Sequence, residues 1–535
     1  MYKKIFVNQV GYLPNMAKRV TFQSDRPVRY SVHTTDGSCV LSGTADRAFE
    51  NAAAGETDYT ADFSSLTAPG RYYIAAEGLG ESDTFLIAEN AYDAFLQKSV
   101  AFFYLQRCGH DLPVSAAGDF AHPACHTAPA RVYGSDERRQ VSGGWHDAGD
   151  YGRYVGPGAM SAAQLLYACE RDPKLLTLYT CPDKTLDSSL PAILEEIKYE
   201  LDWMMKMQRE DGALYHKVSC LSFCSFIMPQ EEKEELYISP VSVTATADFA
   251  AVCALAIRFY EKYDVAYAEK LAEVSRKAYR ALASLSIPGG FKNPPEISTG
   301  EYGDTCDLDE RYWAAAELYK AFGDSSYRED FEAIAKEKIY QGYGWADMGS
   351  YGNLAYITCP RPVDENLKNQ ITDAMKSAAE ELLSTACADG YGTALTLKQY
   401  GWGSNLGAAN HGIQLYDAWI LTKDERYLSA ATDQLSYLCG RNPMGLCYIT
   451  GLGTDAIKHP HHRPSGFLGH AMEGMLSGGP CDWQADEIAK QLFTDQTPPA
   501  KCLADMTGSY STNEIAIYWN SALVLLAASV LGALD

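Results

Sequence analysis

Residues 84–107, TFLIAENAYDAFLQKSVAFFYLQR, contain the change of pattern that decides the fold. Thr84-Phe85-Leu86-Ile87 is a short β-type run, whereas from Ala91 onward apolar residues recur at helical spacing. The segment therefore predicts a boundary between two domains, a β-rich domain of residues 1–88 and a helical domain of residues 89–535.

The first 88 residues predict a small β-sandwich. Short β-type runs occur at 4–7, 19–22, 28–32, 71–74 and 84–87. Turn signals such as Asp36-Gly37 and Pro69-Gly70 separate these runs. Short strands at this spacing are typical of an immunoglobulin-like sandwich.

The rest of the chain predicts an all-α domain. No repeat of fixed short period is visible, so a solenoid with a legible consensus is not expected. Many helix pairs in one domain could instead close into a toroid of helical hairpins. Helical periodicity covers 91–107, 157–170, 190–208, 242–262, 266–284, 308–322, 325–338, 365–386, 405–421, 425–439 and 513–533, with a weaker pattern at 351–358.

Composition and charge exclude several classes of partner. The chain is 47% hydrophobic and 21% charged, which is ordinary for a globular protein. Its 45 Lys+Arg and 69 Asp+Glu give a formal charge of -24, which repels phosphate backbones and anionic bilayers. The longest apolar run, 521–533, is shorter than the roughly 20 residues of a membrane span. Neither nucleic acid nor membrane is an expected partner.

The N-terminus and the cysteines favour a cytoplasmic protein. Asn8-Gln9 ends the apolar run that follows Lys3-Lys4, so no signal peptide is predicted. The fifteen cysteines are an odd number without a short repeated spacing, and we interpret most of them as buried, reduced thiols. A chain that had lost its leader would instead be secreted.

A pair of carboxylates ends the first long connection, residues 108–156. The stretch Trp145-His146-Asp147-Ala148-Gly149-Asp150-Tyr151 places two acids three residues apart, with small residues between them. The backbone can therefore bend so that both acids face one cavity, where one holds a water and the other takes its proton. A calcium loop or a solvated turn has the same spacing.

A glutamate follows the second long connection, residues 440–512. Glu514 lies where a helix begins, beside Tyr510, Tyr518 and Trp519, and burial against rings would raise its pKa into the range of a proton donor. A glutamate that caps the helix is the alternative. The upstream run 459–464, HPHHRP, suits contacts with sugar hydroxyls, and metal binding is the other interpretation of its histidines.

Three segments together resemble the hallmark segments of glycoside hydrolase family nine, namely 145–151, 448–463 and 505–520. Residues 7–12, VNQVGY, are similar to the opening of the immunoglobulin-like domain that many bacterial members carry. The resemblance covers nearly the whole chain, in the family order. It implies an immunoglobulin-like β-sandwich followed by an (α/α) barrel of six helical hairpins, and an enzyme that cleaves β-1,4-glucosidic bonds with inversion.

The resemblance also implies roles for single residues. Asp150 matches the general base, Asp147 the acid that co-positions the attacking water, and Glu514 the general acid. The residues expected to contact substrate or to lead to the acid are His461, Arg463, Tyr510, Asp505 and Trp402. The family's usual residues are replaced at Leu503, Cys447 and Asp455, which leaves subsite preference open.

Trp402, in a glycine-rich connection, is the preferred stacking platform for a sugar. Further rings could stack on sugars or pack in the core, and these are Trp145, Trp313, Trp345, Tyr416 and Trp519.

A structural zinc site is predicted beside the base loop, the stretch 145–151 that carries Asp147 and Asp150. Cys108, Cys125, His126 and His146 make a set of two thiolates and two imidazoles with tetrahedral zinc chemistry. The set resembles the ligands of the zinc that members with the immunoglobulin-like domain carry. His110 and His122 are alternatives to His146 as the fourth zinc ligand.

A calcium site is a further expectation. Thr305, Asp309 and Glu310, with the distant Asp347, resemble a family calcium site. Acids that complement the dipole at a helix N-terminus are the alternative. No organic cofactor is expected.

The expected activity is that of an endoglucanase or a cellodextrinase acting on a β-1,4-linked oligosaccharide or polysaccharide. An exo-acting β-glucosidase or exo-β-glucosaminidase of the same family is the nearest alternative. A zinc-dependent hydrolase and a non-catalytic glycan receptor are alternatives of other classes, and the intact set of acid, base and water-positioning residues argues against the receptor. Endo or exo action and oligomeric state stay open.

Overall fold

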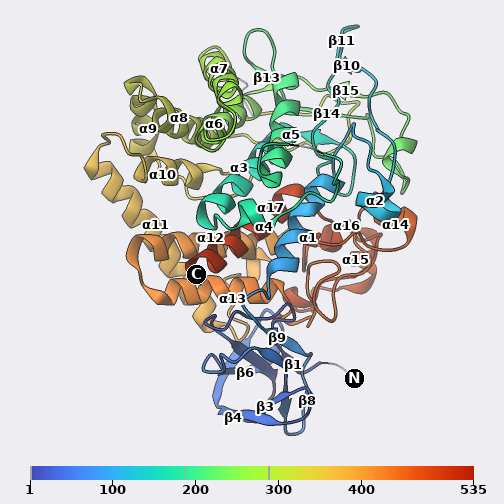
Figure 1. Ribbon diagram of the computed structural model, residues 1–535, viewed down its shortest axis with the longest axis vertical. Helices are drawn as coiled ribbons and strands as arrows, with labels where there is room; N and C mark the ends of the chain where they lie inside the picture. Colours follow the sequence, from blue (N-terminus) through green and yellow to red (C-terminus); the bar gives the residue numbers. More distant parts are fainter. Residues whose placement is uncertain (1–2, 187, 287–289, 535) are drawn as a thin grey trace. The chain divides into compact units, whose positions relative to one another are not determined.

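Buried and more exposed residues alternate along several N-terminal strands, so each of these strands can turn one face to an apolar core. The computed structural model describes residues 3–186, 188–286 and 290–534. Its N-terminal strands form two antiparallel sheets of order β1-β2-β6-β5 and β4-β3-β7-β8, with β9 paired to β7 (Figure 1). The strands are β1 (Ile5–Phe6), β2 (Arg19–Gln23), β3 (Val28–Thr34), β4 (Cys39–Ala45), β5 (Arg47–Asn51), β6 (Glu56–Asp62), β7 (Gly70–Ala76), β8 (Gly80–Glu81) and β9 (Phe85–Ile87).

Aromatic rings form the centre of this domain. Tyr12 makes edge-on contacts with Phe63 and Phe85 at centroid distances of 5.5 and 5.4 Å, and all three rings are buried. Such pairs add stabilisation beyond the area they remove from water. The β-rich N-terminal domain that the sequence predicts is confirmed.

The chain divides into two compact units. Unit 1 comprises Met1–Phe102, Arg171–Leu178 and Ala379–Asp535, and unit 2 comprises Phe103–Glu170 and Tyr179–Ala378. The helices are α1 (Asp93–Leu105), α2 (Val114–Ala117), α3 (Val155–Arg171), α4 (Leu175–Leu178), α5 (Ala192–Met207), α6 (Val243–Tyr260), α7 (Val265–Leu282), α8 (Leu308–Phe322), α9 (Ser325–Glu337), α10 (Gly349–Ile357), α11 (Glu365–Ala388), α12 (Ser404–Thr422), α13 (Glu425–Leu438), α14 (Arg463–Leu468), α15 (Glu487–Leu492), α16 (Tyr510–Asn513) and α17 (Ile517–Leu534).

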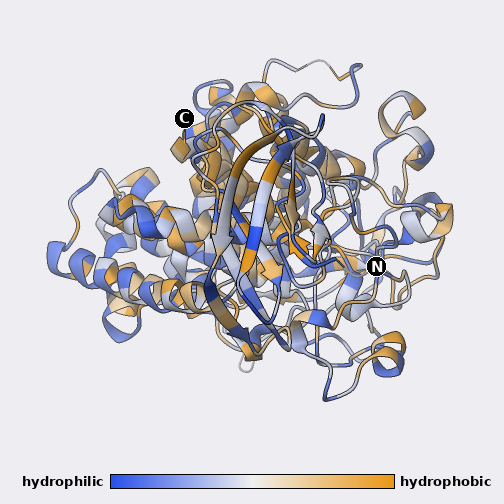
Figure 2. Ribbon diagram, turned by 90° about the horizontal axis from the view of Figure 1, so that it is seen from below, coloured by the Kyte–Doolittle hydropathy of each residue, from blue (hydrophilic) through white to orange (hydrophobic). Residues whose placement is uncertain are grey.

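Helices that follow one another pack together within each unit. In unit 2, α6 packs on α7 and α8, and α8 packs on α9 and α10. In unit 1, α12 packs on α13 and α17. The helical ribbons carry blue and orange stretches in alternation, as amphipathic helices around a core should (Figure 2). Every range predicted from periodicity overlaps a helix, and the weaker pattern at 351–358 overlaps α10.

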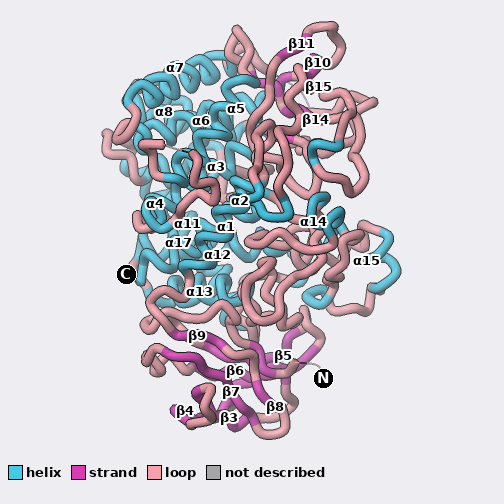
Figure 3. The backbone as a smooth tube through the Cα atoms, turned by 45° about the vertical axis from the view of Figure 1, so that its right-hand side comes forward, coloured by secondary structure: helices cyan, strands magenta, loops and turns pink. Residues whose placement is uncertain are grey.

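The two long connections are built from loops and very short elements. Unit 2 has a five-stranded sheet of order β11-β10-β15-β14-β12 and a ribbon of β13 and β16. Between α13 and α16 the chain runs mainly as loop, interrupted by α14 and α15 (Figure 3). The short strands are β10 (Ala130–Val132), β11 (Arg138–Arg139), β12 (Arg153–Tyr154), β13 (Leu214–Tyr215), β14 (Lys217–Ser219), β15 (Tyr237–Ile238) and β16 (Val241–Ser242).

Helices α6 and α17 are long and apolar enough to cross a membrane by length and composition alone. In the most apolar 18-residue stretch of each helix, 89% of the residues of α6 and 83% of those of α17 are buried in the protein. Core helices of soluble proteins have the same length and apolar composition, so these two properties are weak evidence for a membrane span.

A buried carboxyl of the sandwich makes stability depend on pH. Burial, together with the neighbouring Glu56 and Asp389, raises the pKa of Asp58 to about 8. An unfolded aspartate titrates near 3.9, so between about pH 4 and pH 8 the folded state holds the proton that the unfolded chain has lost. Stability therefore falls as pH rises through this window, with a limiting slope of about 1.4 kcal/mol per pH unit.

We expect Asp58→Asn, a neutral substitute for the protonated acid, to flatten this dependence. The difference between the melting temperatures of variant and wild type, measured by calorimetry from pH 5 to pH 9, should move in favour of the variant as pH rises. Parallel melting curves across this range would contradict the prediction.

Candidate active site

Asp147 and Asp150 lie on a tight loop that leads into β12. The N–H of Asp147 donates to the carbonyl of Gly152 over 2.9 Å, and the N–H of Gly152 donates to Asp150 Oδ2 over 2.9 Å. A Cβ at position 152 would lie 2.5 Å from the Tyr154 hydroxyl and 2.7 Å from Asp150 Oδ2, so a larger residue would displace the acid. The loop closes on itself and holds both acids.

Asp150 is oriented by two donors that share one of its oxygens. Besides the Gly152 N–H, the Tyr154 hydroxyl donates to Asp150 Oδ2 over 3.2 Å. Tyr154 belongs to β12, which pairs with β14 through Arg153 and Val218. The strand pairing thus fixes the residue that orients the candidate base.

Asp147 is almost fully buried and has one strong partner. The hydroxyl of Tyr302 donates to Asp147 Oδ2 over 2.5 Å, while Oδ1 is buried without a hydrogen-bond partner in the protein. Burial and the adjacent charge of Asp150 raise the pKa of Asp147 well above its usual range, and the Tyr302 bond opposes that rise. The orphaned Oδ1 is suited to hold a water.

Sequence reasoning missed Tyr302. Its backbone φ of 45° lies in the left-handed region that side chains other than glycine rarely adopt. Its ring lies edge-on to Trp345 and Tyr154, at centroid distances of 5.2 and 4.9 Å. Strained backbone that aims one hydroxyl at a buried carboxylate is a feature of functional sites.

A buried lysine lies behind the base loop and was also missed. Lys217 Nζ donates to Thr299 Oγ1 over 2.9 Å and lies 5.3 Å from the centre of the Tyr154 ring. Burial lowers the pKa of Lys217 to about 7, and the negative charge of Asp150 acts in the opposite direction. The contact with Thr299 spans 82 residues of sequence, so no local motif marks it.

Helix α5 anchors the start of the base loop. The N–H of Trp145 donates to Glu200 over 2.7 Å, and its indole N–H donates to Glu196 over 2.8 Å. Arg107 in turn forms a buried ion pair with Glu196. Trp145 is therefore a fixed part of the core and offers no surface to a sugar.

The candidate acid Glu514 lies in unit 1 between α16 and α17 and is half-buried. Its backbone is held on both sides, because its N–H donates to the Tyr510 carbonyl over 3.2 Å and its carbonyl accepts from Gly478 over 2.8 Å. His461 runs beside it through a parallel bridge, with the His461 N–H donating to the Asn513 carbonyl over 2.8 Å. The structure therefore brings together Glu514 and His461, which are far apart in the sequence.

Asp505 holds the histidine loop, residues 458–462, against the acid segment, residues 510–514. Its carboxylate accepts from the N–H groups of Lys458 and His459 over 2.9 and 2.8 Å, and from Asn513 Nδ2 over 3.1 Å. These bonds occupy the carboxylate with protein donors, so Asp505 positions its neighbours.

Arg463 and Tyr510 are placed by the same loops. Arg463 is the first residue of α14 and is buried. The Tyr510 ring lies 5.2 Å from Trp402 and 5.9 Å from His461, measured between centroids. Trp402 is 43% exposed, as a stacking platform requires. By contrast, Trp313, Tyr416 and Trp519 are buried, which favours core packing, the other use that the sequence left open for these rings.

Four residues of unit 2 form a group that could hold a metal ion. One ligand atom from each of Cys108, Cys125, His126 and His146 lies within 4.8 Å of the others. His126 Nε2 donates to Glu232 over 2.8 Å, which leaves its Nδ1 buried without a hydrogen-bond partner in the protein. An orphaned imidazole nitrogen of this kind fits a metal ligand, and a carboxylate on the other nitrogen fixes the tautomer.

The competing histidines lie outside this group. His122 Nδ1 lies 2.8 Å from the Pro123 carbonyl, and the His110 ring packs edge-on against Tyr104 and Tyr199. The two candidate metal groups found among the described residues also leave out His459, His461 and His462.

The second candidate group is a cluster of buried carboxylates at the start of α8. Oxygens of Asp304, Asp309 and Glu310 lie within 4.8 Å of one another. Burial raises the pKa of Asp309 to about 6, and burial and Asp248 raise that of Glu310 well above its usual range. Four oxygens have no hydrogen-bond partner in the protein, namely Asp304 Oδ2, Asp309 Oδ1 and both oxygens of Glu310.

Asp347 lies outside this group of carboxylates, and Thr305 precedes Asp309 in the chain. Thr305 is exposed, and Asp347 Oδ1 accepts from the Gly349 N–H over 3.0 Å. The structure instead adds Asp304, which sequence reasoning did not choose.

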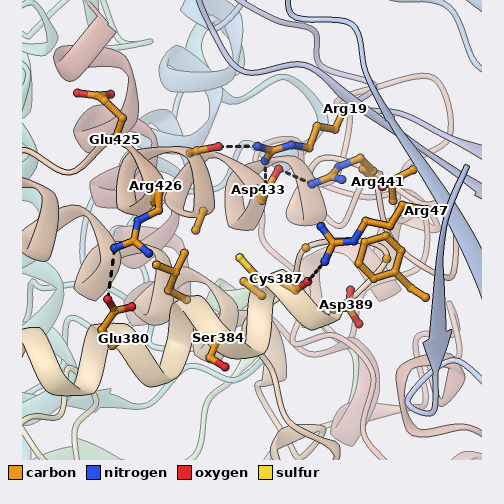
Figure 4. A pocket seen from close by; sticks show the side chains of 18 residues that line it. Arg19, Arg47, Glu380, Ser384, Cys387, Asp389, Glu425, Arg426, Asp433 and Arg441 are labelled. Atoms are coloured by element: carbon orange, nitrogen blue, oxygen red, sulfur yellow. Dashed lines mark hydrogen bonds and ion pairs between the residues drawn. The ribbon is translucent and has the colours of Figure 1, made fainter. Parts of the chain in front are cut away.

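A cavity of about 670 Å³ in unit 1 lies between the sandwich and helices α11 and α13. Figure 4 shows Arg19 and Arg441 converging on Asp433, while Arg47 donates to the Cys387 carbonyl over 3.0 Å. Because the carboxylate of Asp433 is shared by two guanidinium groups, we interpret this network as structural.

Each unit carries acid–base groups of its own. Unit 2 has a fixed pair of aspartates, and unit 1 has a half-buried glutamate beside a histidine. Carboxyl groups of these kinds serve as base and acid in glycoside hydrolases. Residues 92–527 match the model of glycosyl hydrolase family 9, and residues 1–81 match the cellulase N-terminal Ig-like domain. The chain belongs to glycosyl hydrolase family 9.

Similar proteins cover almost the whole chain. A cellodextrinase of Butyrivibrio fibrisolvens is 38% identical over 551 residues, which are 99% of this chain and 100% of the relative. A single mutant of a thermostable endoglucanase from Alicyclobacillus acidocaldarius has a TM-score of 0.93 at 35% identity, with 99% of each chain covered. A Zn-binding triple mutant of the family 9 endoglucanase J30 has a TM-score of 0.90 at 33% identity, with 97% of this chain and 99% of that chain covered. This likeness confirms the predicted fold class, a β-sandwich followed by the family's (α/α) barrel.

Proposed function

We propose that this glycoside hydrolase cleaves β-1,4-glucosidic bonds of cello-oligosaccharides with inversion at the anomeric carbon. The names of the similar proteins, a cellodextrinase and endoglucanases, support this substrate class. The observation that carries the proposal is the base loop, where Asp150 accepts two hydrogen bonds on one oxygen and Asp147 keeps one oxygen without a protein partner.

The proposed reaction is a single displacement. Glu514 donates its proton to the glycosidic oxygen as the bond from that oxygen to the anomeric carbon breaks, and the bonding electron pair leaves with the oxygen. A water held by Asp147 loses a proton to Asp150, and its oxygen forms the new bond to the anomeric carbon from the opposite face. A β-linked substrate therefore yields an α-anomeric product.

The remaining groups of unit 1 bind and place the sugar in this proposal. His461 and Arg463 hydrogen-bond to hydroxyls of the substrate, and Trp402 stacks on a pyranose ring. Asp505 keeps the histidine loop in register with the acid segment through its three hydrogen bonds.

Hydrolysis of cellopentaose, followed by chromatography and NMR, tests the proposal. We expect glucose, cellobiose or cellotriose whose new reducing ends are α-anomers when first formed, before mutarotation. A β-anomeric product would contradict inversion, and a folded protein that leaves all cello-oligosaccharides intact would contradict the substrate class.

We infer that Cys108, Cys125, His126 and His146 hold a structural zinc ion. Two thiolates, two imidazoles and the orphaned Nδ1 of His126 fit tetrahedral zinc. When bound, zinc would cross-link the chain on both sides of residues 109–124 and fix His146 next to Asp147. Four protein ligands close such a site, which speaks against the alternative of a zinc-dependent hydrolase.

We infer further that Asp304, Asp309 and Glu310 hold calcium. Hard cations prefer carboxylate oxygens, and four orphaned oxygens in a buried cluster are costly without a cation or protons. Calcium content measured after reloading should drop in Glu310→Gln, whereas an unchanged content would reject this site.

We also propose that the enzyme works inside the cell on imported oligosaccharides. None of the fifteen cysteines, all of which lie in the described part of the chain, forms a disulfide, as expected in a reducing compartment. Recovery of the native protein from the medium in a cell-fractionation assay would contradict this location.

A further inference from the structure

The loop that follows Cys481 carries an exposed tryptophan, Trp483, near the acid segment of unit 1. Trp483 is 62% exposed. A single exposed aromatic residue is common on protein surfaces and needs no explanation alone. Two further features distinguish Trp483, namely the backbone that supports its ring and the way its loop is fastened to the residues before Glu514.

The first feature is the support beneath the ring. A Cβ at Gly401 would lie 2.3 Å from the Trp483 indole, so the ring rests directly on the Gly401 backbone, next to Trp402. The N–H of Asp482 donates to the Tyr400 carbonyl over 3.0 Å, and the N–H of Cys481 donates to the Cys502 carbonyl over 2.8 Å. The indole is thus fixed to the connection that carries the stacking platform.

The second feature is the set of hydrogen bonds that holds the C-terminal end of the Trp483 loop. The buried carboxylate of Asp486 accepts from Ser509 Oγ over 2.9 Å, and from the N–H and Oγ of Ser511 over 2.9 and 2.6 Å. The Tyr510 hydroxyl donates to the Ala485 carbonyl over 2.8 Å. Four hydrogen bonds therefore hold the loop of Trp483 to the segment that ends at Glu514.

Trp483 is linked through the Gly401 backbone to Trp402, and from there ring contacts lead toward Glu514. Trp483 lies on Gly401, Trp402 follows it in the chain, and the Trp402 ring lies 5.2 Å from that of Tyr510. Tyr510 in turn lies 5.9 Å from His461, the neighbour of Glu514. Exposed, rigidly mounted rings match the apolar faces of successive glucosyl units, because each pyranose exposes its C–H groups on its two faces.

We propose that Trp483 forms a distal sugar-binding subsite, in which its indole stacks on a glucosyl unit of a bound β-1,4-glucan beyond the units held at Trp402. This inference rests on the proposed function. It makes Trp483 a residue that selects long chains and leaves the chemistry of short ones untouched. The occupant is an uncharged glucan, since a series of aromatic rings offers stacking and no fixed charge.

Kinetics on oligosaccharides of increasing length test the subsite. In Trp483→Ala we expect kcat/KM for cellohexaose to fall about 3- to 12-fold, the effect of losing one aromatic stacking contact. The value for cellotriose should stay within about 2-fold of wild type, and Trp483→Tyr should restore most of the loss on cellohexaose. Leu492→Ala, which removes another exposed apolar side chain in the next helix (55% exposed), is the matched control and should change neither value.

The outcomes separate this inference from the proposed function. If wild type degrades cello-oligosaccharides and Trp483→Ala loses activity equally on all lengths, the residue is structural and the subsite is rejected. An unchanged kcat/KM of Trp483→Ala on every chain length would also reject the subsite. Calorimetric titration of Glu514→Gln and of Glu514→Gln/Trp483→Ala with cellohexaose gives a readout without turnover, and equal affinities there would also overturn the subsite. Wild type that acts on no cello-oligosaccharide would instead overturn the proposed function.

Discussion

Glu514→Gln should lower kcat for cellopentaose by about 10²- to 10⁴-fold, the range that general acid–base groups contribute. Glutamine keeps the size of the side chain but has no acidic proton to give to the leaving oxygen. The backbone bonds that hold position 514, from its N–H to Tyr510 and from Gly478 to its carbonyl, do not involve the side chain. The fold should therefore persist, and steady-state rates with a melting curve measure the effect.

The leaving group provides a control that is specific for a general acid. Cleavage of 2,4-dinitrophenyl β-cellobioside needs no protonation, because dinitrophenolate is a stable anion. Glu514→Gln should therefore hydrolyse it within about 10-fold of the wild-type rate. Asp150→Asn should lose activity on both substrates, because every substrate needs the activated water. An equal loss on both substrates in Glu514→Gln would show that Glu514 acts in some other way.

The helices of this protein could be predicted from sequence because their signal is local. Amphipathic periodicity extends over three or more turns in helices such as α5, α7 and α13, and α17 is marked by a long apolar run. Even the weaker pattern at 351–358 overlaps α10. Strands were harder to predict. Strand β4 is mostly exposed, and β6 has little alternation, so the runs at 39–45 and 56–62 lack the pattern that marked their partners.

The candidate acids could be predicted because the segments around them resemble the hallmark segments of the family, although neither Asp-x-x-Asp nor a glutamate at a helix start is distinctive alone. The residues that support them could not be predicted. Tyr302 reaches Asp147 across 155 residues of sequence, and its left-handed backbone is not encoded by a residue type such as glycine. Asp486 fastens the Trp483 loop across 25 residues. Such contacts form only when the whole chain folds, so local spacing carries no trace of them.

Exposure could not be predicted from residue type either. The sequence left Trp145 and Trp313 open as sugar platforms or core residues and did not mark Trp483. In the structure Trp145 and Trp313 are enclosed, whereas Trp402 and Trp483 are exposed. An aromatic ring serves a core and a carbohydrate surface equally well. Only the packing of the loops around it distinguishes the two uses.

Loss of the proposed zinc ligand Cys125 should release the metal and lower both stability and activity. Wild type should hold one zinc ion per chain at this site, and Cys125→Ser should hold none after dialysis, because a serine hydroxyl does not replace a thiolate. Zinc binding is coupled to folding at structural sites, so we expect the melting temperature to fall by roughly 5–10 °C. Elemental analysis and calorimetry of the same samples measure both effects.

His122→Ala is the matched control, because His122 is a nearby histidine outside the metal group and should leave the zinc content unchanged. The expected loss of activity in Cys125→Ser follows from the chain itself. His146 precedes Asp147, and its N–H donates to the Gln106 carbonyl over 2.8 Å, so a mobile His146 would loosen the base loop. Activity should therefore fall in kcat more than in KM, and chelator should inactivate wild type only as fast as the loop opens. Full zinc content in Cys125→Ser would reject the ligand set, and rapid, reversible inactivation of a folded protein would instead favour a metal that takes part in catalysis.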